Sequence, residues 1–274
     1  MIIISMFQRL FFVFLIALFI LGGNSIHPSS ALAESTVALT GVQSGDLIRG
    51  ESFSAVYYLG EDGFRYVFPN DKTYFTWYEN FDDVKWLSDA DLGTIQIGGN
   101  VTYRPGSKMI KINSDPKTYA IGKNGSLHWI NSEEVAKTLY GNDWNQKIDD
   151  VPDGFFSNYS TSENSTIEDA STFDITYVES QSPTINVDKS LEEPTVITIS
   201  DSNYSSDLVT IQSGEVIRFE NKGTTKHTAT ADDLSWGTGT IESGSGYNRY
   251  FNTKGTYTYF DSYNSNLTGT IIVE

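Results

Sequence analysis

The feature that most constrains the fold is a stretch of sequence that occurs twice. The segment SGDLIRGESFSAVYYLGEDGFRYVFPN, from Ser44, aligns with GSKMIKINSDPKTYAIGKNGSLHWINS, from Gly106, at a constant offset of 62 residues. Further along, the offset slips by one or two residues, which pairs Phe81 with Trp144. Because similarity at a fixed period indicates a repeated structural unit, we expect two α+β modules of about 60 residues in tandem within residues 41–159.

Each copy has the pattern of a β-hairpin followed by a short helix. The tetrapeptides GEDG (60–63) and GKNG (122–125) separate strand-like segments, and glycine and asparagine tolerate the positive φ angles of tight turns. Side chains that can cap a helix follow the second strand of each copy: Asn70 or Asp71, and Asn131 or Ser132. The sequence therefore predicts a duplicated hairpin-helix module.

Aromatic residues are concentrated after the first predicted cap. Tyr74, Trp77, Tyr78 and Phe81 follow one another at a spacing of three or four residues, which predicts one face of a helix packed into a core. The alternative is an aromatic platform for sugar rings or peptides, which requires several rings to be exposed together.

The two copies resemble a repeated module of predicted secreted bacterial proteins. The motifs AVYYLGEDGFRYVFPN, NVTYRPG and DVPDGFFSNY carry this resemblance, which covers about residues 41–160. It implies a surface location and no known chemistry.

The first 33 residues have the pattern of a secretory signal peptide. Arg9 is their only charged residue, residues 10–21 form an apolar run, and Ala31-Leu32-Ala33 provides a small-residue cleavage site. We expect cleavage after Ala33, contact with the membrane only before cleavage, and a secreted or cell-surface protein with an extracellular partner that the sequence does not identify.

Charge and cysteine content exclude several classes of function. The formal net charge is −17 and no cluster of Lys and Arg occurs, which argues against nucleic-acid binding. The absence of cysteine excludes disulfides, thiol nucleophiles and thiolate-bound metals. We therefore expect no enzyme and no cofactor. A carboxylate-based hydrolase in the repeat region is a further alternative, because two acids are sufficient for glycoside hydrolysis.

Residues 160–194 differ in composition from both flanking regions. They are rich in Ser, Thr, Asp and Glu and poor in aromatic residues. Such a segment buries little apolar surface to offset its conformational entropy, so we expect a flexible acidic linker between two independently folding halves.

Residues 195–274 show strand patterns at short intervals, including TVITI, DLVTI, EVIRFEN, GTYTYF and TGTIIVE. Apolar and polar residues alternate in several of them, which predicts an all-β antiparallel sandwich of Greek-key type.

This C-terminal sequence resembles the cupredoxins, the small blue-copper proteins. In that family a histidine follows the strand that reads VIRFEN here, and the last loop carries a cysteine, then a histidine and a methionine three and six residues later. The resemblance places the copper ligands at four positions of this chain: His227, Asp261, Asn264 and Leu267.

Only the first of the four ligands is retained. Blue-copper chemistry depends on two imidazoles and a thiolate, so we expect a degenerate domain without a type 1 copper site. The function predicted from the sequence is a non-catalytic binding or scaffold protein. The alternative is a copper-binding or electron-transfer protein, in which His227, Asp261 and Asn264 hold copper weakly through oxygen and nitrogen.

Overall fold

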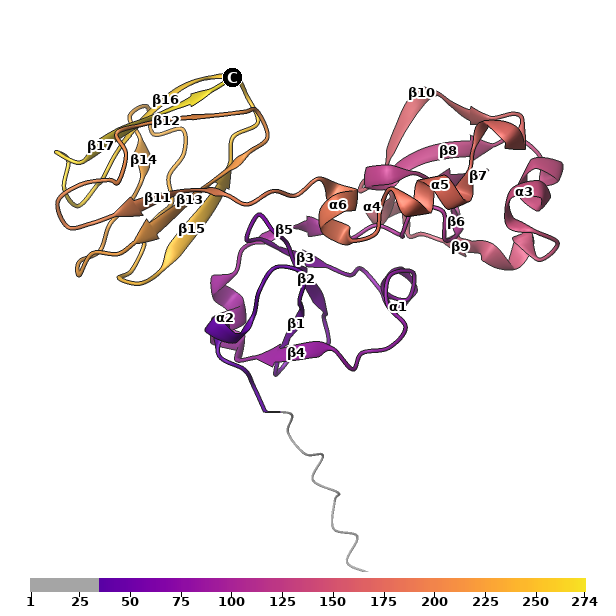
Figure 1. Cartoon of the computed structure of the whole chain (residues 1–274), viewed down its shortest axis with the longest axis horizontal. Coiled ribbons are helices and arrows are strands. Elements are labelled where there is room, and N and C mark those ends of the chain that lie inside the picture. Colours follow the sequence, from indigo (N-terminus) through magenta and orange to yellow (C-terminus); the bar gives the residue numbers. More distant parts are fainter. Residues whose placement is uncertain (1–34) are drawn as a thin grey trace, which may run out of the picture. The chain divides into compact units, whose positions relative to one another are not determined.

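Residues 35–274 are described by a computed structural model, which gives only the backbone of residues 162–164. They form four β-sheets with a few short helices (Figure 1). The predicted signal peptide lies outside the described residues. Within residues 35–274, no helix is both long enough and apolar enough to cross a membrane.

The first sheet is five-stranded and has the order β4-β1-β2-β3-β5. Its strands are β1 (Leu47–Gly50), β2 (Tyr57–Leu59), β3 (Arg65–Val67), β4 (Val84–Leu87) and β5 (Ile97–Asn100). The hairpin strands β1, β2 and β3 pair antiparallel, whereas the outer strands β4 and β5 run parallel to their neighbours.

The second sheet, read from its other edge, has the order β9-β6-β7-β8-β10. Its strands are β6 (Met109–Ile112), β7 (Asp115–Ile121), β8 (Ser126–Ile130), β9 (Ile148–Asp150) and β10 (Ser160–Ile167). Again the three hairpin strands pair antiparallel and the two outer strands pair parallel. Strands that correspond in sequence therefore occupy the same places in the two sheets.

Both faces of each five-stranded sheet are covered. Leu47 and the next residue, Ile48, are buried in two different apolar clusters, as expected for side chains that point to opposite faces of a strand. The aligned residues Met109 and Ile110 are buried in two clusters of the second sheet.

The structure confirms the hairpin turns and one capping candidate in each copy. Gly63 has φ 78° and Asn124 has φ 54°, the left-handed conformation that glycine and asparagine adopt most readily. Asn70 caps α1 (Asp71–Tyr74) by accepting a hydrogen bond from the amide of Thr73, and Ser132 caps α3 (Glu133–Tyr140) through the amide of Val135.

The first predicted helix is much shorter than expected. Helix α1 ends at Tyr74, so the prediction of a continuous helical face as far as Phe81 is wrong. The hydroxyl of Thr76 bonds to the carbonyl of Thr73 at 2.7 Å, and the Tyr74 hydroxyl bonds to the carbonyl of Asn80 at 2.6 Å. These hydrogen bonds stabilise a tight turn in place of further helix.

All helices of residues 35–274 are short. They are η1 (Leu39–Gly41), α1 (Asp71–Tyr74), α2 (Asp89–Thr94), η2 (Lys123–Gly125), α3 (Glu133–Tyr140), η3 (Trp144–Lys147), α4 (Asp153–Phe156), η4 (Ala170–Thr172), α5 (Ile175–Ser180) and α6 (Ile185–Lys189).

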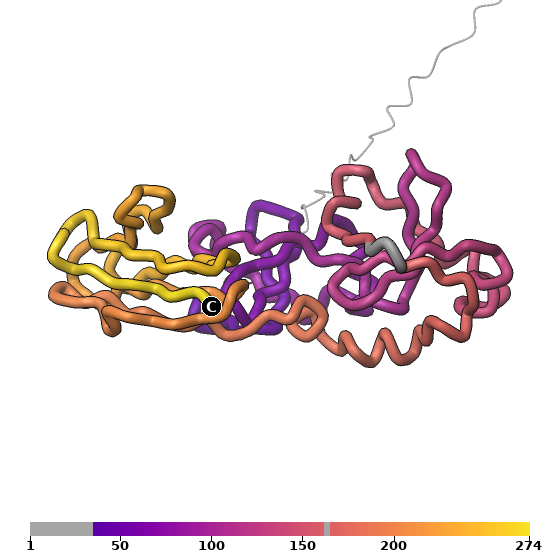
Figure 2. Tube along the Cα trace, turned by 90° about the horizontal axis from the view of Figure 1, so that it is seen from above, coloured from indigo at the N-terminus to yellow at the C-terminus, as the bar shows by residue number. Residues whose placement is uncertain are grey.

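Residues 160–194 form regular structure, in contrast to the predicted flexible linker. They contain β10, η4, α5 and α6, and Figure 2 follows their trace into the next domain. Strand β10 pairs with β8 through backbone hydrogen bonds, which Ser and Thr residues make as well as apolar ones do. Three apolar side chains anchor the segment in the core, since Ile167, Phe173 and Ile185 are buried, whereas Tyr177 and Val187 are exposed.

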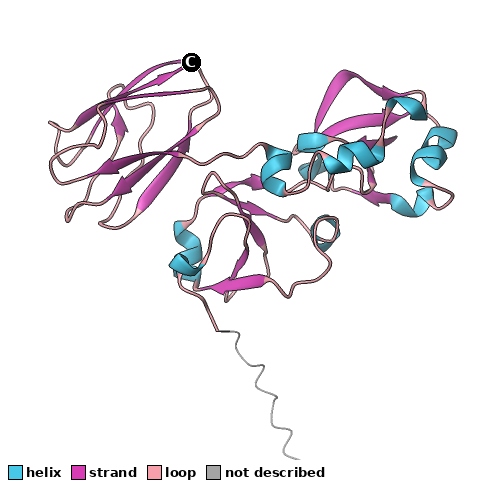
Figure 3. Cartoon of the chain, in the orientation of Figure 1, coloured by secondary structure: helices cyan, strands magenta, loops and turns pink. Residues whose placement is uncertain are grey.

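The C-terminal region contains strands and loops without helices, among the residues that the structure describes (Figure 3). Its strands are β11 (Thr195–Ile199), β12 (Leu208–Ile211), β13 (Val216–Asn221), β14 (Thr230–Ala231), β15 (Gly246–Tyr250), β16 (Gly255–Phe260) and β17 (Thr268–Val273). They form two sheets with the orders β11-β13-β15 and β12-β17-β16-β14. The pairs β11/β13 and β12/β17 are parallel, so the prediction of an entirely antiparallel sandwich is wrong.

One apolar cluster fills this C-terminal domain. Alternating residues of β13, such as Ile217 and Phe219, are fully buried in it. The ring of Tyr259, from β16, meets Phe219 edge-on at 5.5 Å between centroids. The core fixes the ends of β14 and β16, which carry the candidate site.

Candidate functional site

The candidate site lies where strands β14 and β16 pair. Thr230 is opposite Phe260 in this antiparallel pair. His227 precedes β14 and Asp261 directly follows β16, so the pairing brings together two residues that are 34 positions apart in sequence.

His227 and Asp261 form a buried hydrogen-bonded pair. The Nδ1 atom of His227 is 2.7 Å from Oδ2 of Asp261, and the two residues are only 2% and 0% exposed. The other carboxylate oxygen of Asp261 accepts hydrogen bonds from the amides of Thr228, at 2.9 Å, and Tyr263, at 3.0 Å. Both oxygens of this buried carboxylate are therefore engaged by groups of the protein itself.

The second ring nitrogen of His227 is directed at a carboxylate that the sequence analysis did not connect with the site. Nε2 lies 3.3 Å from Oδ1 of Asp201 and 3.2 Å from the hydroxyl of Thr225. Asp201 also accepts hydrogen bonds from the hydroxyl and amide of Thr224, at 2.7 and 2.8 Å. The hydroxyl groups of Thr224 and Thr225 hold the pKa of Asp201 well below its ordinary value.

Asn264 takes part in the loop chiefly through its backbone. Its amide donates to the carbonyl of Asp261 at 3.2 Å, and its carbonyl accepts from the amide of Leu267 at 2.9 Å. Its side-chain oxygen accepts a long hydrogen bond, 3.4 Å, from the amide of Asn266. Asn264 therefore shapes the turn, and its side chain makes no hydrogen bond to His227 within residues 35–274.

Leu267 belongs to the hydrophobic core. It is 5% exposed and is part of the apolar cluster that fills the domain. A hydrocarbon side chain has no donor atom for a metal, so this position contributes packing only.

These residues do not fit a type 1 copper ion. The set of donor side chains contains one imidazole and no sulfur, and both nitrogens of that imidazole face carboxylates. The carboxylate at position 261 is a hard oxygen donor, which differs from a thiolate in both softness and covalency. Within residues 35–274, no group of three or more His, Cys, Asp or Glu side chains has an arrangement suited to a metal ion.

The arrangement that does exist connects three loops. Asp201 follows β11, His227 precedes β14 and Asp261 follows β16, and the imidazole lies between the two carboxylates. Reasoning from sequence identified the His227 and Asp261 positions but missed the roles of Asp201, Thr224 and Thr225. No local pattern joins Asp201 to His227, because the contact depends on how β11 and β13 pair in the folded domain.

Comparison with protein families clarifies the fold of this region. Residues 167–273 match a family model described as the cupredoxin-like domain. The chain contains a cupredoxin-like domain. The matched range begins inside the segment that was predicted to be a linker and continues through β17. A search of curated proteins finds no similar sequence.

Several solved copper proteins are similar to part of the chain. Amicyanin from Paracoccus versutus (Thiobacillus versutus) has 26% identity over 30% of this chain and 81% of its own, with a TM-score of 0.28. A reduced Cu(I) form of an amicyanin mutant at pH 4 has 20% identity, covers 30% of this chain and 82% of its own, and has a TM-score of 0.28. A copper-containing nitrite reductase from Thermus scotoductus SA-01 has 20% identity and a TM-score of 0.29, over 30% of this chain and 23% of the reductase.

Proposed function

We propose that the protein is an exported, non-catalytic binding or scaffold protein whose cupredoxin-like domain has no type 1 copper site. The observation that carries this proposal is the hydrogen-bonded His227–Asp261 pair. At the place where the resemblance to cupredoxins calls for a thiolate, a buried carboxylate bonds to the only imidazole of the candidate site. The pair then stabilises the loops of the domain instead of presenting ligands to a metal.

The two five-stranded sheets support the binding part of the proposal. We propose that they are two copies of one module, because corresponding strands have the same order and directions in both. A tandem of small modules is a common way to build an extended binding surface. Export is proposed from the signal-peptide pattern of residues 1–33, and the mass of the secreted protein, expected to begin at Glu34, tests it.

One observation favours the alternative, a site for copper on oxygen and nitrogen donors. Asp201 and Asp261 flank the imidazole of His227, so each of two carboxylates lies within hydrogen-bond distance of one imidazole nitrogen. A metal at this place would have to displace at least one of these hydrogen bonds.

A metal titration separates the two functions. The secreted protein is titrated with Cu²⁺ and Zn²⁺ while absorbance and heat are recorded, with His227→Ala as the control variant. We expect no intense visible absorption, because that band requires sulfur, and no sub-micromolar binding. Sub-micromolar copper binding that His227→Ala abolishes would assign the protein to the metal-binding class instead.

Restoring ligands tests whether position 261 corresponds to the thiolate. We expect Asp261→Cys alone to stay colourless with Cu²⁺, because residues 264 and 267 still supply no second imidazole and no axial sulfur. A strong blue colour from this single change would show that other residues complete the site.

A further inference from the structure

The two repeats have hollows lined by corresponding residues, and we infer that each hollow binds a ring of an uncharged glycan. This inference rests on the proposed binding function and names its ligand class. The hollows lie where β3 and β8 lead into α1 and α3. Neither is lined by a residue of the candidate copper site.

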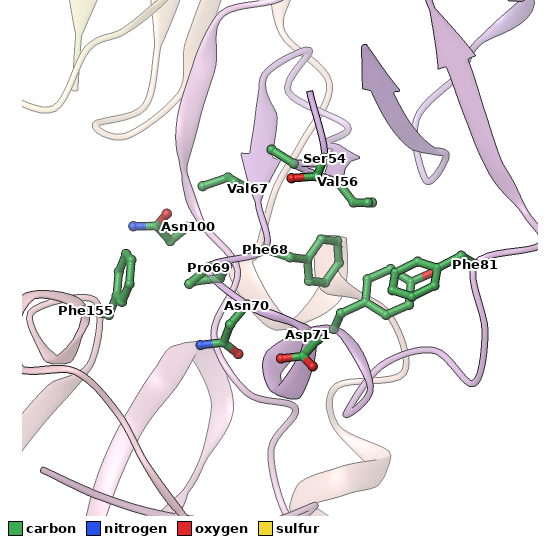
Figure 4. A pocket seen from close by; sticks show the side chains of 12 residues that line it. Ser54, Val56, Val67, Phe68, Pro69, Asn70, Asp71, Phe81, Asn100 and Phe155 are labelled. Carbon is green, nitrogen blue, oxygen red and sulfur yellow. The ribbon is translucent and has the colours of Figure 1, made fainter. Parts of the chain in front are cut away.

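The first hollow has a volume of about 440 Å³. Five of the side chains that line it are Phe68, Asn70, Asp71, Tyr74 and Phe81, and Figure 4 labels four of these around the hollow. This volume is within the range of small-molecule sites, which are typically about 300–1,000 Å³, and a lining of aromatic groups with a few polar ones is also typical of such sites.

The second hollow has a volume of about 320 Å³ and is lined by residues at the aligned positions of the second repeat. Each of its ten lining residues has a counterpart that lines the first hollow. Four of these aligned pairs are Phe68 with Ile130, Asn70 with Ser132, Asp71 with Glu133, and Phe81 with Trp144. Both repeats therefore form the hollow at the same place, so it does not depend on the conformation of one particular loop.

An exposed aromatic ring borders the first hollow. Phe81 is 48% exposed, and one face of its ring stacks on the buried ring of Tyr74, with centroids 4.3 Å apart and planes 25° apart. Phe75 does not line the hollow, but it is 49% exposed and meets Phe81 edge-on at 5.3 Å. A ring held from behind in this way presents a flat apolar surface to solvent at a fixed angle. The C–H face of a pyranose packs on such a surface with little loss of freedom in the protein.

The sequence left open whether Tyr74, Trp77, Tyr78 and Phe81 form a core or a platform. Tyr74 is buried, and Trp77 and Tyr78 pack half-buried against the same apolar cluster, whereas Phe81 is exposed. In the second repeat Ala136 replaces the buried tyrosine, and the half-buried Trp144 supplies the aromatic surface.

Polar groups next to the rings suit the hydroxyl groups of a sugar. The Oδ1 atom of Asn70 caps α1 through the amide of Thr73 at 2.8 Å, and within residues 35–274 no hydrogen bond uses its Nδ2 group. Asp71 is exposed, and among the residues that the structure describes its side chain accepts only from the amide of Lys72, at 2.9 Å. An amide donor and a carboxylate acceptor thus face solvent beside an apolar ring, and hydroxyl groups can satisfy both.

Charge decides which glycan is expected. Asp71 and its counterpart Glu133 place a carboxylate at the same position of both hollows, and the whole chain carries a formal net charge of −17. The second hollow is also lined by Lys117, which offsets Glu133, so the repulsion of uronic acids and phosphorylated polymers comes from the first hollow and from the net charge of the chain. Two such sites on one chain favour a polymer of repeated uncharged rings, because binding at one site raises the effective concentration at the other.

The inference is tested by titrating the secreted full-length protein with cellohexaose and chitohexaose, with polygalacturonate as the anionic comparison. We expect binding of at least one neutral hexasaccharide and a change in Trp144 fluorescence, with no binding of polygalacturonate. Phe81→Ala and Trp144→Ala should each weaken retention on the matching insoluble polymer by about tenfold or more, and the double variant should lose it.

Tyr177→Ala is the matched control. Tyr177 is an aromatic residue that is 61% exposed and lies outside both hollows, so its removal should leave glycan retention unchanged. Circular dichroism confirms that each variant is folded. The inference is overturned if neither neutral hexasaccharide binds, if polygalacturonate binds as well as they do, or if the double variant retains binding. These outcomes do not depend on the metal titration, so either proposal can fail without the other.

Discussion

The candidate site of the cupredoxin-like domain and the hollows of the repeats differ in whether their polar groups have partners inside the protein. At the candidate site, both nitrogens of His227 and both oxygens of Asp261 are engaged inside the protein. At the first hollow, Asn70 and Asp71 keep polar groups directed at solvent beside an exposed ring. The difference teaches that polar groups paired inside the protein stabilise the fold, whereas accessible polar groups without internal partners are available to a ligand.

The largest expected effect is the removal of the buried carboxylate. Asp261→Ala leaves His227 and the amides of Thr228 and Tyr263 without their partner in the core, and we expect it to reduce the free energy of unfolding by about 3–5 kcal/mol. Urea denaturation followed by circular dichroism measures this loss. Asp201→Ala, at the solvent side of the same imidazole, should cost clearly less. Equal losses would contradict the view that the stability of the candidate site depends mainly on the buried carboxylate of Asp261.

The next effect distinguishes two buried tyrosines of the same core. The hydroxyl of Tyr204 donates to the carbonyl of Thr228 at 2.6 Å, so Tyr204→Phe should cost about 1–2 kcal/mol. The hydroxyl of Tyr259 is buried and has no hydrogen-bond partner within residues 35–274. Tyr259→Phe should therefore leave the midpoint of urea unfolding unchanged or raise it. A larger loss for Tyr259→Phe than for Tyr204→Phe would reverse this interpretation.

A smaller effect is expected for the exposed ring of the first hollow. Phe81→Ala removes the stacked contact with Tyr74 and the edge-on contact with Phe75, each worth about 0.5 kcal/mol at this exposed position, while Tyr74 keeps its buried position. Thermal unfolding should show a shift of only a few degrees. A loss comparable to that of Asp261→Ala would indicate that Phe81 is a core residue and that its exposure has no role in binding.

The smallest effect concerns pH. Hydrogen bonds from Thr224 and Thr225 lower the pKa of Asp201 on folding. Its charged form therefore stabilises the folded protein at pH values above the ordinary pKa of 3.8. This contribution is lost as the pH falls through the lower pKa of the folded state. The stability difference between the native protein and Asp201→Asn should therefore be constant near neutral pH and shrink in the strongly acidic range. A difference that grows on acidification would contradict the assigned direction.

Regular patterns were predictable from sequence where local chemistry decides the structure. The turns around Gly63 and Asn124 follow from backbone conformation, and the strands of the C-terminal domain follow from alternation of apolar and polar residues. The helix predicted through Phe81 fails because hydrogen bonds of Thr76 and Tyr74 favour a turn, although the spacing of aromatic residues is helical.

Long-range pairing explains what the sequence did not reveal. Strand β10 is polar, and its structure depends on the neighbouring edge of β8 rather than on its own composition. In the candidate site, the contact between His227 and Asp261 was predictable from the resemblance to cupredoxins, because both occupy ligand positions. The contact with Asp201 was not, since it requires the parallel pairing of β11 with β13.

The correspondence of the two hollows also has an evolutionary consequence. If the two hollows are copies of one pocket, as proposed, one copy can change while the other keeps its role. The differences between Tyr74 and Ala136 and between Phe81 and Trp144 fall in the walls of the pocket, whereas the acidic character of Asp71 and Glu133 is common to both. Under the proposed binding of uncharged rings, such differences would alter which ring each copy prefers, so the two repeats would recognise different units of the same material.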